Sequence, residues 1–213
     1  MRIIAGTHRG RRLLPPDEHS PTRPIPDRVK QSLFDRLWSL GLPPTGTSEQ
    51  TDSLPSETAN SLDVPGGQEV LDLFSGTGSL GLETLSRGAT FCTFVERDRS
   101  AIQNLRRNLE TLKFSESARV VAGDALTLTW QSLLTPGRIG LIFVDPPYAL
   151  LAEPEGWNRV SRVLTALKTV AHCEATAMLR TPRGKNLPPI QGWSGPDSRT
   201  YGSMSVHLYF NQS

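Results

Sequence analysis

The chain contains a four-residue stretch, Asp145-Pro146-Pro147-Tyr148, whose groups suit the handling of an amine. An apolar run precedes it, so a carboxylate stands where a buried strand would end. Two successive prolines lack N–H groups and hold the backbone extended, which leaves carbonyl oxygens free to accept hydrogen bonds. The Asp145 carboxylate and the Pro146 carbonyl can then accept both hydrogens of one exocyclic amine, while Tyr148 stacks on its ring. This predicts methylation of a nitrogen on an unpaired or extruded base, although a plain strand-ending turn would also use these residues.

A glycine-rich loop provides a second group of candidates, suited to an adenosine ligand. Residues 72–81, "DLFSGTGSLG", satisfy the pattern G-x-G-x-x-G between an expected strand and an expected helix. Glu96, at the end of the next strand, can accept both hydroxyls of a ribose. The pattern by itself fits a nicotinamide dinucleotide as well, and glycines can also do no more than turn the chain.

Two acidic positions favour S-adenosylmethionine over a dinucleotide. Asp72 can reach the ammonium of an amino-acid ligand, directly or through water, and would repel a pyrophosphate. Asp124 can accept the adenine amino group, and Ala125 offers a backbone N–H to the ring. We therefore expect S-adenosylmethionine as cofactor, bound by Asp72, Phe74, Ser75, Gly76, Thr77, Gly78, Glu96, Arg97, Asp124, Ala125 and Asp145.

These candidates require strands that end at one edge of a sheet. The pattern predicts strands at 69–74, 90–96, 118–123, 139–145, 173–181 and 203–210, and helices at 79–88, 99–112, 125–134 and 158–171. Such alternation is typical of an α/β fold, and we expect a doubly wound, mostly parallel, seven-stranded Rossmann-like sheet. Ligands of such sheets bind beyond the carboxyl ends of the strands, where Asp72, Glu96 and Asp145 fall.

The N-terminal part differs in character from the rest. Residues 1–16, "MRIIAGTHRGRRLLPP", predict a small basic β-hairpin, and residues 25–40 predict a capped amphipathic helix. Residues 41–67 are rich in Pro, Gly, Ser and Thr and predict a flexible loop. We therefore divide the chain into an N-terminal hairpin and helix (1–40), this loop, and a main domain (68–213).

Composition narrows the class of protein. Net charge is only +2, but the first 30 residues hold seven Lys or Arg against three Asp or Glu. This local excess of positive charge fits either a nucleic-acid-binding surface or a charged, solvated N-terminus. The two cysteines form no pair, and the four histidines lack ligand spacing, so we expect a reduced protein without a metal site. No apolar run suits a membrane span or signal peptide, which favours a cytoplasmic location.

The ordered set "DLFSGTGSLGLE", "FVERD", "GDA" and "DPPY" resembles class I S-adenosylmethionine-dependent methyltransferases that modify amino groups. "MRIIAGTHRGRRL", "RPIPDRVKQSLFDRL", "SRGA" and "YGSMSVHLY" are similar to segments of the bacterial 16S rRNA guanine-N2 methyltransferases. The resemblance covers nearly the whole chain except 41–67. The chain departs from that family's usual pattern at Ile25, Pro26 and Asp35.

The resemblance implies methylation of the exocyclic N2 amine of one guanine in 16S rRNA. The expected partner is that rRNA within the small subunit or an assembly intermediate, and the expected state is a monomer. The segment before the first helix would contribute Arg23, Asp27 and Arg28 to the cofactor site. The hairpin would help to hold RNA through Arg2, His8, Arg9, Arg11 and Arg12.

Several alternatives remain open at this point. A DNA adenine-N6 or cytosine-N4 methyltransferase uses the same chemistry, but the chain has no obvious additional domain for reading the major groove. A glutamine-N5 protein methyltransferase commonly has Asn in place of Asp145. A nicotinamide-dependent oxidoreductase leaves residues 145–148 unexplained, and a non-catalytic RNA-binding protein leaves the three strand-end carboxylates unexplained.

Overall fold

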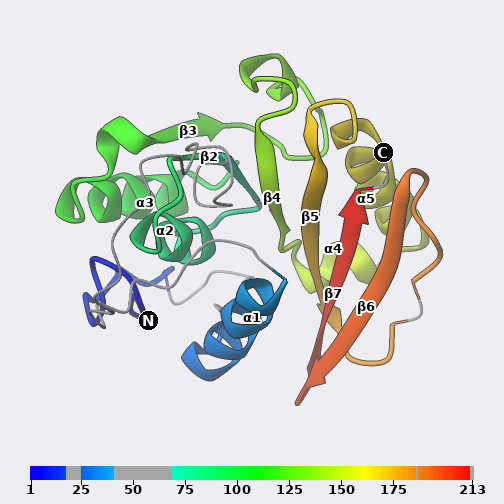
Figure 1. Cartoon of the computed structure of the whole chain (residues 1–213), viewed down its shortest axis with the longest axis horizontal. Coiled ribbons are helices and arrows are strands. Elements are labelled where there is room, and N and C mark those ends of the chain that lie inside the picture. The colour runs from blue at the N-terminus through cyan, green and yellow to red at the C-terminus, as the bar shows by residue number, and fades with distance from the viewer. Residues whose placement is uncertain (18–24, 41–68, 186, 212–213) are drawn as a thin grey trace, which may run out of the picture.

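The computed structural model describes residues 1–17, 25–40, 69–185 and 187–211. The strands in these ranges are β1 (Glu69–Leu73), β2 (Phe91–Glu96), β3 (Ala118–Ala122), β4 (Ile139–Val144), β5 (Ala171–Pro182), β6 (Trp193–Tyr201) and β7 (Met204–Asn211). They form one sheet in the order β3-β2-β1-β4-β5-β7-β6 (Figure 1). The neighbours from β3 to β5 are parallel, and β7 is antiparallel to both β5 and β6. This confirms the expected mostly parallel, seven-stranded α/β sheet.

The helices of the described part connect the strands and cover the sheet. They are α1 (Asp27–Ser39), α2 (Ser79–Ser86), α3 (Arg99–Thr111), α4 (Tyr148–Ala152) and α5 (Pro154–Leu167), with the 3-10 turns η2 (Ser115–Ser117) and η3 (Gln131–Leu133). Of these, α1, α2, α3 and α5 match helices expected from the sequence. None of the described helices is long and apolar enough to cross a membrane.

Side chains of the central strands alternate between two buried clusters, one on each face of the sheet. Val70, Phe94, Phe143 and Met178 pack with residues of α1, α2 and α3, whereas Leu71, Val95, Ile142 and Leu179 pack with residues of α5. By the same alternation Asp72, Asp145 and Arg180 fall on the face of α1 and α2. The period of the strands thus brings three charged side chains together where the strands end.

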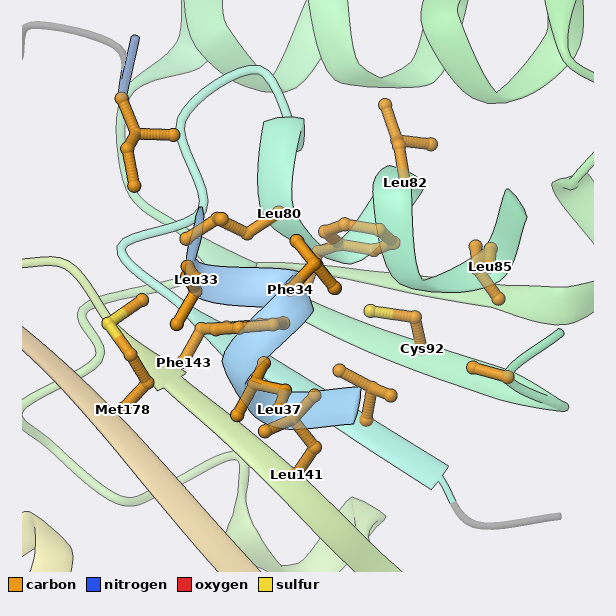
Figure 2. Close-up of a cluster of buried hydrophobic side chains, with 14 of the residues drawn as sticks. Leu33, Phe34, Leu37, Leu80, Leu82, Leu85, Cys92, Leu141, Phe143 and Met178 are labelled. Atoms are coloured by element: carbon orange, nitrogen blue, oxygen red, sulfur yellow. The ribbon is translucent and has the colours of Figure 1, made fainter. Parts of the chain in front are cut away.

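Helix α1 packs on the sheet through its apolar face. Figure 2 shows Leu33, Phe34 and Leu37 lying over Leu141 and Phe143 of β4. The rings of Phe34 and Phe143 are tilted, with centroids 6.0 Å apart. This packing attaches α1 to the face of the sheet that α2 and α3 also cover, close to the end of β4, which Asp145 follows.

Residues 1–17 approach the expected hairpin but form no strands. One antiparallel bridge joins Arg2 to Arg12, and Ile3 N–H donates to the Arg11 carbonyl at 2.9 Å. Ile3 and Leu13 are buried in the same cluster as α1. Gly10 N–H also donates to the Ile3 carbonyl at 2.9 Å and Leu13 N–H to the Met1 carbonyl at 3.2 Å, so the segment is a hairpin whose arms are paired but too short to count as strands. The loop expected at 41–67 lies outside the described residues.

Two further expectations were wrong in detail. The helix expected at 125–134 is instead a series of turns with η3, because the Asp124 carboxylate captures the Leu126 N–H at 2.9 Å and Leu128 has φ 58°. The sequence pattern did not predict strand β6, which the structure contains. It contains Gly195 and Pro196, which coincide with a register shift against β7, and these residues hide its pattern.

Candidate active site

Two adjoining cavities lie beyond the carboxyl ends of the central strands. The larger cavity has a volume of about 360 Å³, within the range of small-molecule sites, and its lining includes Phe74, Gly76, Glu96, Arg97, Asp98, Asp124, Ala125 and Pro147. The smaller cavity has a volume of about 40 Å³ and its lining includes Met1, Pro16, Ile25, Asp72, Phe74, Ser75, Gly76, Thr77, Asp145 and Arg180. Phe74 and Gly76 belong to both linings, so the glycine loop lies between the two cavities and forms part of the wall of each.

Glu96 holds the glycine loop against the end of β2. Its Oε2 accepts the Gly76 N–H at 2.8 Å, and its Oε1 accepts the N–H groups of Arg97 and Asp98 at 2.8 Å each. A carboxylate offers about four acceptor sites, so these three bonds leave roughly one open. The side chain is thus fixed in place at the wall of the larger cavity, with acceptor capacity left for one hydroxyl.

The three glycines of the loop have different tasks. Gly76 has φ 54° and lines the cavities, with nothing within 4 Å of an added Cβ. Gly78 has φ 85°, and a Cβ there would lie 2.4 Å from Leu105 of α3. A Cβ on Gly81 would lie 2.4 Å from the Phe94 ring. Gly78 and Gly81 therefore serve turning and close helix packing, and only Gly76 of the three faces the site.

Asp124 lies in the larger cavity between two arginines. Its Oδ2 is 3.9 Å from Arg97 and 3.8 Å from Arg159 of α5. Its Oδ1 accepts the Leu126 N–H, which fixes the turn after β3 and orients the carboxylate. The structure thus brings Asp124 to the same cavity as Glu96, as expected for two contacts to one adenosine.

Asp72 is almost completely buried, with 1% of its surface exposed. Its Oδ2 accepts the N–H of Gly81 in the first turn of α2 at 2.9 Å. Burial raises the pKa of the Asp72 carboxyl to about 8; the Gly81 hydrogen bond opposes the shift, and the negative charges of Asp145 and Glu96 add to it. A cation in the smaller cavity would reverse this shift, so the site is suited to a positively charged group.

Asp145 forms an ion pair that the sequence did not suggest. The Nε of Arg180 lies 2.6 Å from its Oδ1, and only 5% of the arginine side chain and 16% of the aspartate side chain are exposed. Burial raises the pKa of Asp145, and Arg180 opposes that rise. Arg180 follows the buried stretch 175–179 of β5 and lies two residues after Met178, on the same side of the strand. A single charged residue on the buried side of a strand was the sequence feature that could have indicated this ion pair.

Pro147 has the extended backbone that the sequence predicts for the proline pair. Pro147 has φ −53° and ψ 137° and lines the larger cavity, while Pro146 is buried. The Asp145 N–H points back to the Leu73 carbonyl at 3.4 Å, which continues the pairing of β4 with β1. Tyr148 begins α4 and is 36% exposed, with the Arg180 guanidinium 5.6 Å from its ring centroid. The stretch therefore lies beside both cavities with its aromatic ring accessible.

The basic hairpin residues fall into two groups. Arg9, Arg11 and Arg12 are exposed. Arg2 is also exposed but pairs with Asp27 at 3.2 Å, and the His8 ring packs against Phe114 with centroids 4.6 Å apart. Neither Asp27 nor the exposed Arg28 is part of the two cavity linings, and Arg23 lies outside the described residues. The structure thus leaves three arginines directly available to an anion and gives the other two residues protein partners.

A buried ionic cluster attaches the hairpin to the main sheet. Lys30, Glu83 and Arg87 have fully buried side chains, with Glu83 3.1 Å from Lys30 and 2.9 Å from Arg87. Glu83 also accepts the N–H groups of Ile4 and Ala5 at 2.8 and 3.0 Å. This cluster links α1, α2 and the first strand-like arm of the hairpin.

The segment after the hairpin runs along α3. Asn108 accepts the Leu14 N–H at 2.8 Å, and Asn104, one turn earlier, donates to the Pro15 carbonyl at 3.1 Å. Asn108 also donates to the carbonyl of Thr77 in the glycine loop at 3.1 Å. Pro16 then reaches the smaller cavity. The N-terminal segment is therefore part of the cavity wall, a role that its sequence did not reveal.

Residues 1–210 match the profile of a family described as conserved hypothetical protein 95. The chain belongs to this family. Among its relatives, the ribosomal RNA small subunit methyltransferase D of Escherichia coli is 38% identical over 218 residues, which cover 98% of this chain and 89% of the relative. The protein of the same name from Haemophilus influenzae is 32% identical, with 99% and 94% covered.

Solved structures agree with this assignment. A structure described as a putative methyltransferase from Escherichia coli matches with a TM-score of 0.69 and 30% identity, covering 100% of this chain and 98% of that one. An RNA methyltransferase from Salinibacter ruber in complex with S-adenosyl-L-homocysteine shares the fold, with a TM-score of 0.55, 13% identity and coverage of 90% and 95%. The sheet is therefore a Rossmann-like methyltransferase sheet.

Proposed function

We propose that the chain transfers a methyl group from S-adenosylmethionine to the exocyclic N2 amine of a guanine in small-subunit rRNA. One observation carries this proposal: Asp145, followed by two prolines and an accessible tyrosine, borders a cavity suited to a cationic amino acid and adjoins another suited to adenosine. The family relatives named as ribosomal RNA small subunit methyltransferases support rRNA as the acceptor.

The cofactor is S-adenosylmethionine, and the two cavities have groups that match its parts. Glu96 retains acceptor capacity for a ribose hydroxyl, and Asp124 offers carboxylate oxygens to the adenine amine. Asp72, buried beside the smaller cavity, suits the ammonium of the methionine end. When bound, the cofactor supplies an electrophilic methyl on a sulfonium; the guanine N2 forms the new C–N bond as the C–S bond breaks, which leaves a neutral thioether.

The substrate amine would be oriented by two acceptors. Oδ1 of Asp145 is engaged by Arg180, so Oδ2 and the Pro146 carbonyl are the oxygens that would accept the two N2 hydrogens. This pulls the nitrogen lone pair out of conjugation with the ring. The methylated nitrogen is cationic and acidic, so it loses its proton to Asp145 or to water without a strong base. Tyr148 provides a stacking surface for the extruded base.

The RNA would be held by the hairpin. Arg9, Arg11 and Arg12 are exposed, and the segment that follows them leads to the smaller cavity. Phosphate contacts of this kind give affinity that falls with salt. We further propose that the protein acts as a monomer in the cytoplasm, on the small subunit or an assembly intermediate, and that residues 1–40 are a unit separate from the main domain.

The test is transfer of labelled methyl to three acceptors in parallel: small subunits that lack the modification, naked 16S rRNA and duplex DNA. Label on rRNA that maps to guanine N2 supports the proposal, and the comparison of subunits with naked rRNA identifies the preferred form. Label on DNA alone would keep the amine chemistry and overturn the substrate. Asp145→Ala should retain RNA binding and lose transfer, which separates an enzyme from an RNA-binding protein.

A further inference from the structure

Arg180 contacts the two side chains that the proposed reaction needs at the substrate amine. Its Nε donates to Asp145 Oδ1 at 2.6 Å, and its guanidinium carbon lies 5.6 Å from the ring centroid of Tyr148. We propose that Arg180 is a positioning residue for methyl transfer, which orients Asp145 towards the amine and supports the Tyr148 ring under the base. This inference rests on the proposed function and assigns a third participant to the same site.

The sheet register brings Arg180 to Asp145. Phe143 pairs with Met178 and Val144 with Leu179 across β4 and β5, so the next step of the same register sets Asp145 beside Arg180. Both side chains face α1 and α2, because the residues two positions earlier belong to the cluster on that face. The contact is thus built into the parallel pairing of two central strands.

Burial strengthens this ion pair and also raises the free-energy cost of leaving either charge without its partner. An arginine that is 95% buried loses most of its hydration and needs a compensating charge, which Asp145 provides. Charge-assisted bonds of this length fix both partners in orientation. With Oδ1 held by Nε, the carboxylate cannot rotate freely, and Oδ2 becomes the oxygen available to the substrate.

The charge of Arg180 also determines whether Asp145 can accept a hydrogen bond. Titratable and charged groups come close from several elements: Asp72 from β1, Arg180 from β5 and Tyr148 from α4, while Glu96 of β2 acts on Asp72. Burial favours the neutral acid of Asp145, and Arg180 is the cation that favours the carboxylate. A protonated Asp145 would present an O–H and lose part of its accepting capacity for the amine.

Tyr148 receives the second contact. The guanidinium lies over the ring at a distance typical of cation–π interactions. Because one face of the ring is covered in this way, the other face remains for the base. Arg180 therefore sets the plane on which a base would stack, in addition to the direction of the Asp145 oxygens.

The experiment compares Arg180→Gln, Arg180→Lys and the control Arg183→Gln, which removes an exposed arginine just after β5. The acceptor is the small subunit lacking the modification, and the readouts are kcat, KM for the acceptor, cofactor affinity and the dependence of kcat on pH. We expect Arg180→Gln to lower kcat by about 100-fold, as loss of a preorganised polar group commonly does. Because Arg180 also lines the smaller cavity, cofactor affinity is measured in parallel, and kcat at saturating cofactor should fall by a larger factor than that affinity changes.

The pH profile distinguishes positioning from a structural role. Without the cation, Asp145 ionises at higher pH, so the acidic limb of the kcat profile should move upward in Arg180→Gln. Arg180→Lys keeps the charge and should return the limb towards wild type while kcat stays reduced. An unchanged limb in Arg180→Gln, or an equal loss of kcat in Arg183→Gln, overturns the proposal.

Two further outcomes remain decisive. If Arg180→Gln does not fold, Arg180→Lys decides alone. A wild-type kcat in Arg180→Lys would show that the planar guanidinium group is not required and would overturn the positioning role. If the wild type methylates an amine other than guanine N2, the proposed substrate fails, yet the same pH shift read on that acceptor still supports or overturns the role of Arg180.

Discussion

Asn108 donates a hydrogen bond through Nδ2 to the carbonyl oxygen of Thr77 at 3.1 Å. Its Oδ1 at the same time accepts the N–H of Leu14 at 2.8 Å. One buried amide on α3 therefore joins the glycine loop to the segment that follows the basic hairpin. The part of the chain proposed to hold RNA is thereby connected to the part proposed to hold the cofactor.

Asn108→Ala should loosen both segments. It leaves the Leu14 N–H and the Thr77 carbonyl without their partner, which we expect to lower the free energy of unfolding by about 1–3 kcal/mol. Cofactor affinity should also fall, because the glycine loop loses a support. Urea unfolding and titration calorimetry measure the two quantities. The matched control is Asn104→Ala, which removes one bond on the same helix face, and equal effects of the two variants would contradict the assignment.

Asp72 should make stability depend on pH. Its pKa in the folded, cofactor-free protein is about 8, above the ordinary value of 3.8. From about pH 4 to 8 the folded state therefore holds a proton that the unfolded chain has released, and the free energy of unfolding falls as pH rises through this window. Urea unfolding at several pH values should show this decline, and Asp72→Asn should reduce it. A decline of equal size in Asp72→Asn would assign it to other groups.

The same carboxyl should release a proton when the cofactor binds. A bound ammonium favours the ionised form of Asp72, so binding near pH 7 should expel up to one proton. Calorimetry in two buffers with different ionisation enthalpies measures this number directly. We expect Asp72→Asn to bind more weakly and to release close to none. Equal proton release by wild type and variant would contradict a cationic group beside Asp72.

The residues of the buried ionic cluster should contribute unequally to the free energy of unfolding. Glu83 faces two buried cations and two backbone N–H groups, so Glu83→Gln should cost about 3–5 kcal/mol in the free energy of unfolding. Lys30→Met should cost less, because Glu83 retains Arg87 and both N–H groups. Urea unfolding ranks the two variants, and a larger loss for Lys30→Met would refute this account of the cluster.

The exposed hairpin arginines should act on RNA alone. Arg9→Glu combined with Arg11→Glu should weaken RNA binding and lower the slope of log affinity against log salt by roughly one for each phosphate that the variant no longer neutralises. Cofactor affinity should stay unchanged. Arg162→Glu, an exposed arginine on α5 across the sheet, serves as the control and should leave RNA binding intact. Parallel loss of cofactor and RNA binding in the double variant would indicate a structural hairpin.

Local pattern was sufficient to predict the parts of the site that lie at strand ends. Glu96 and Asp145 each terminate an apolar run, Asp72 lies one residue before the end of β1, and parallel strands bring such ends to one edge. Arg180 also ends an apolar run, but its importance comes from the register between β4 and β5, which a single sequence does not reveal. Asn108 is similar, since its partners lie 31 and 94 residues away.

The errors in the fold have local causes that compete with periodicity. At 125–134, apolar spacing suggested a helix, but the Asp124 side chain captures a backbone N–H and Leu128 adopts a left-handed conformation. In β6, Gly195 and Pro196 interrupt the alternation of an edge strand, and only pairing with β7 defines it. A local side-chain contact thus decides the conformation at 125–134, and tertiary pairing decides it in β6.

The most direct test of the central claim is the identity of the methylated nucleoside. Small subunits lacking the modification are incubated with the protein and S-adenosylmethionine, and the 16S rRNA is digested and analysed by mass spectrometry. The account predicts N2-methylguanosine at one position with the wild type, and none with Asp145→Ala. A methylated adenosine or cytidine, or undiminished methylation by Asp145→Ala, would contradict it.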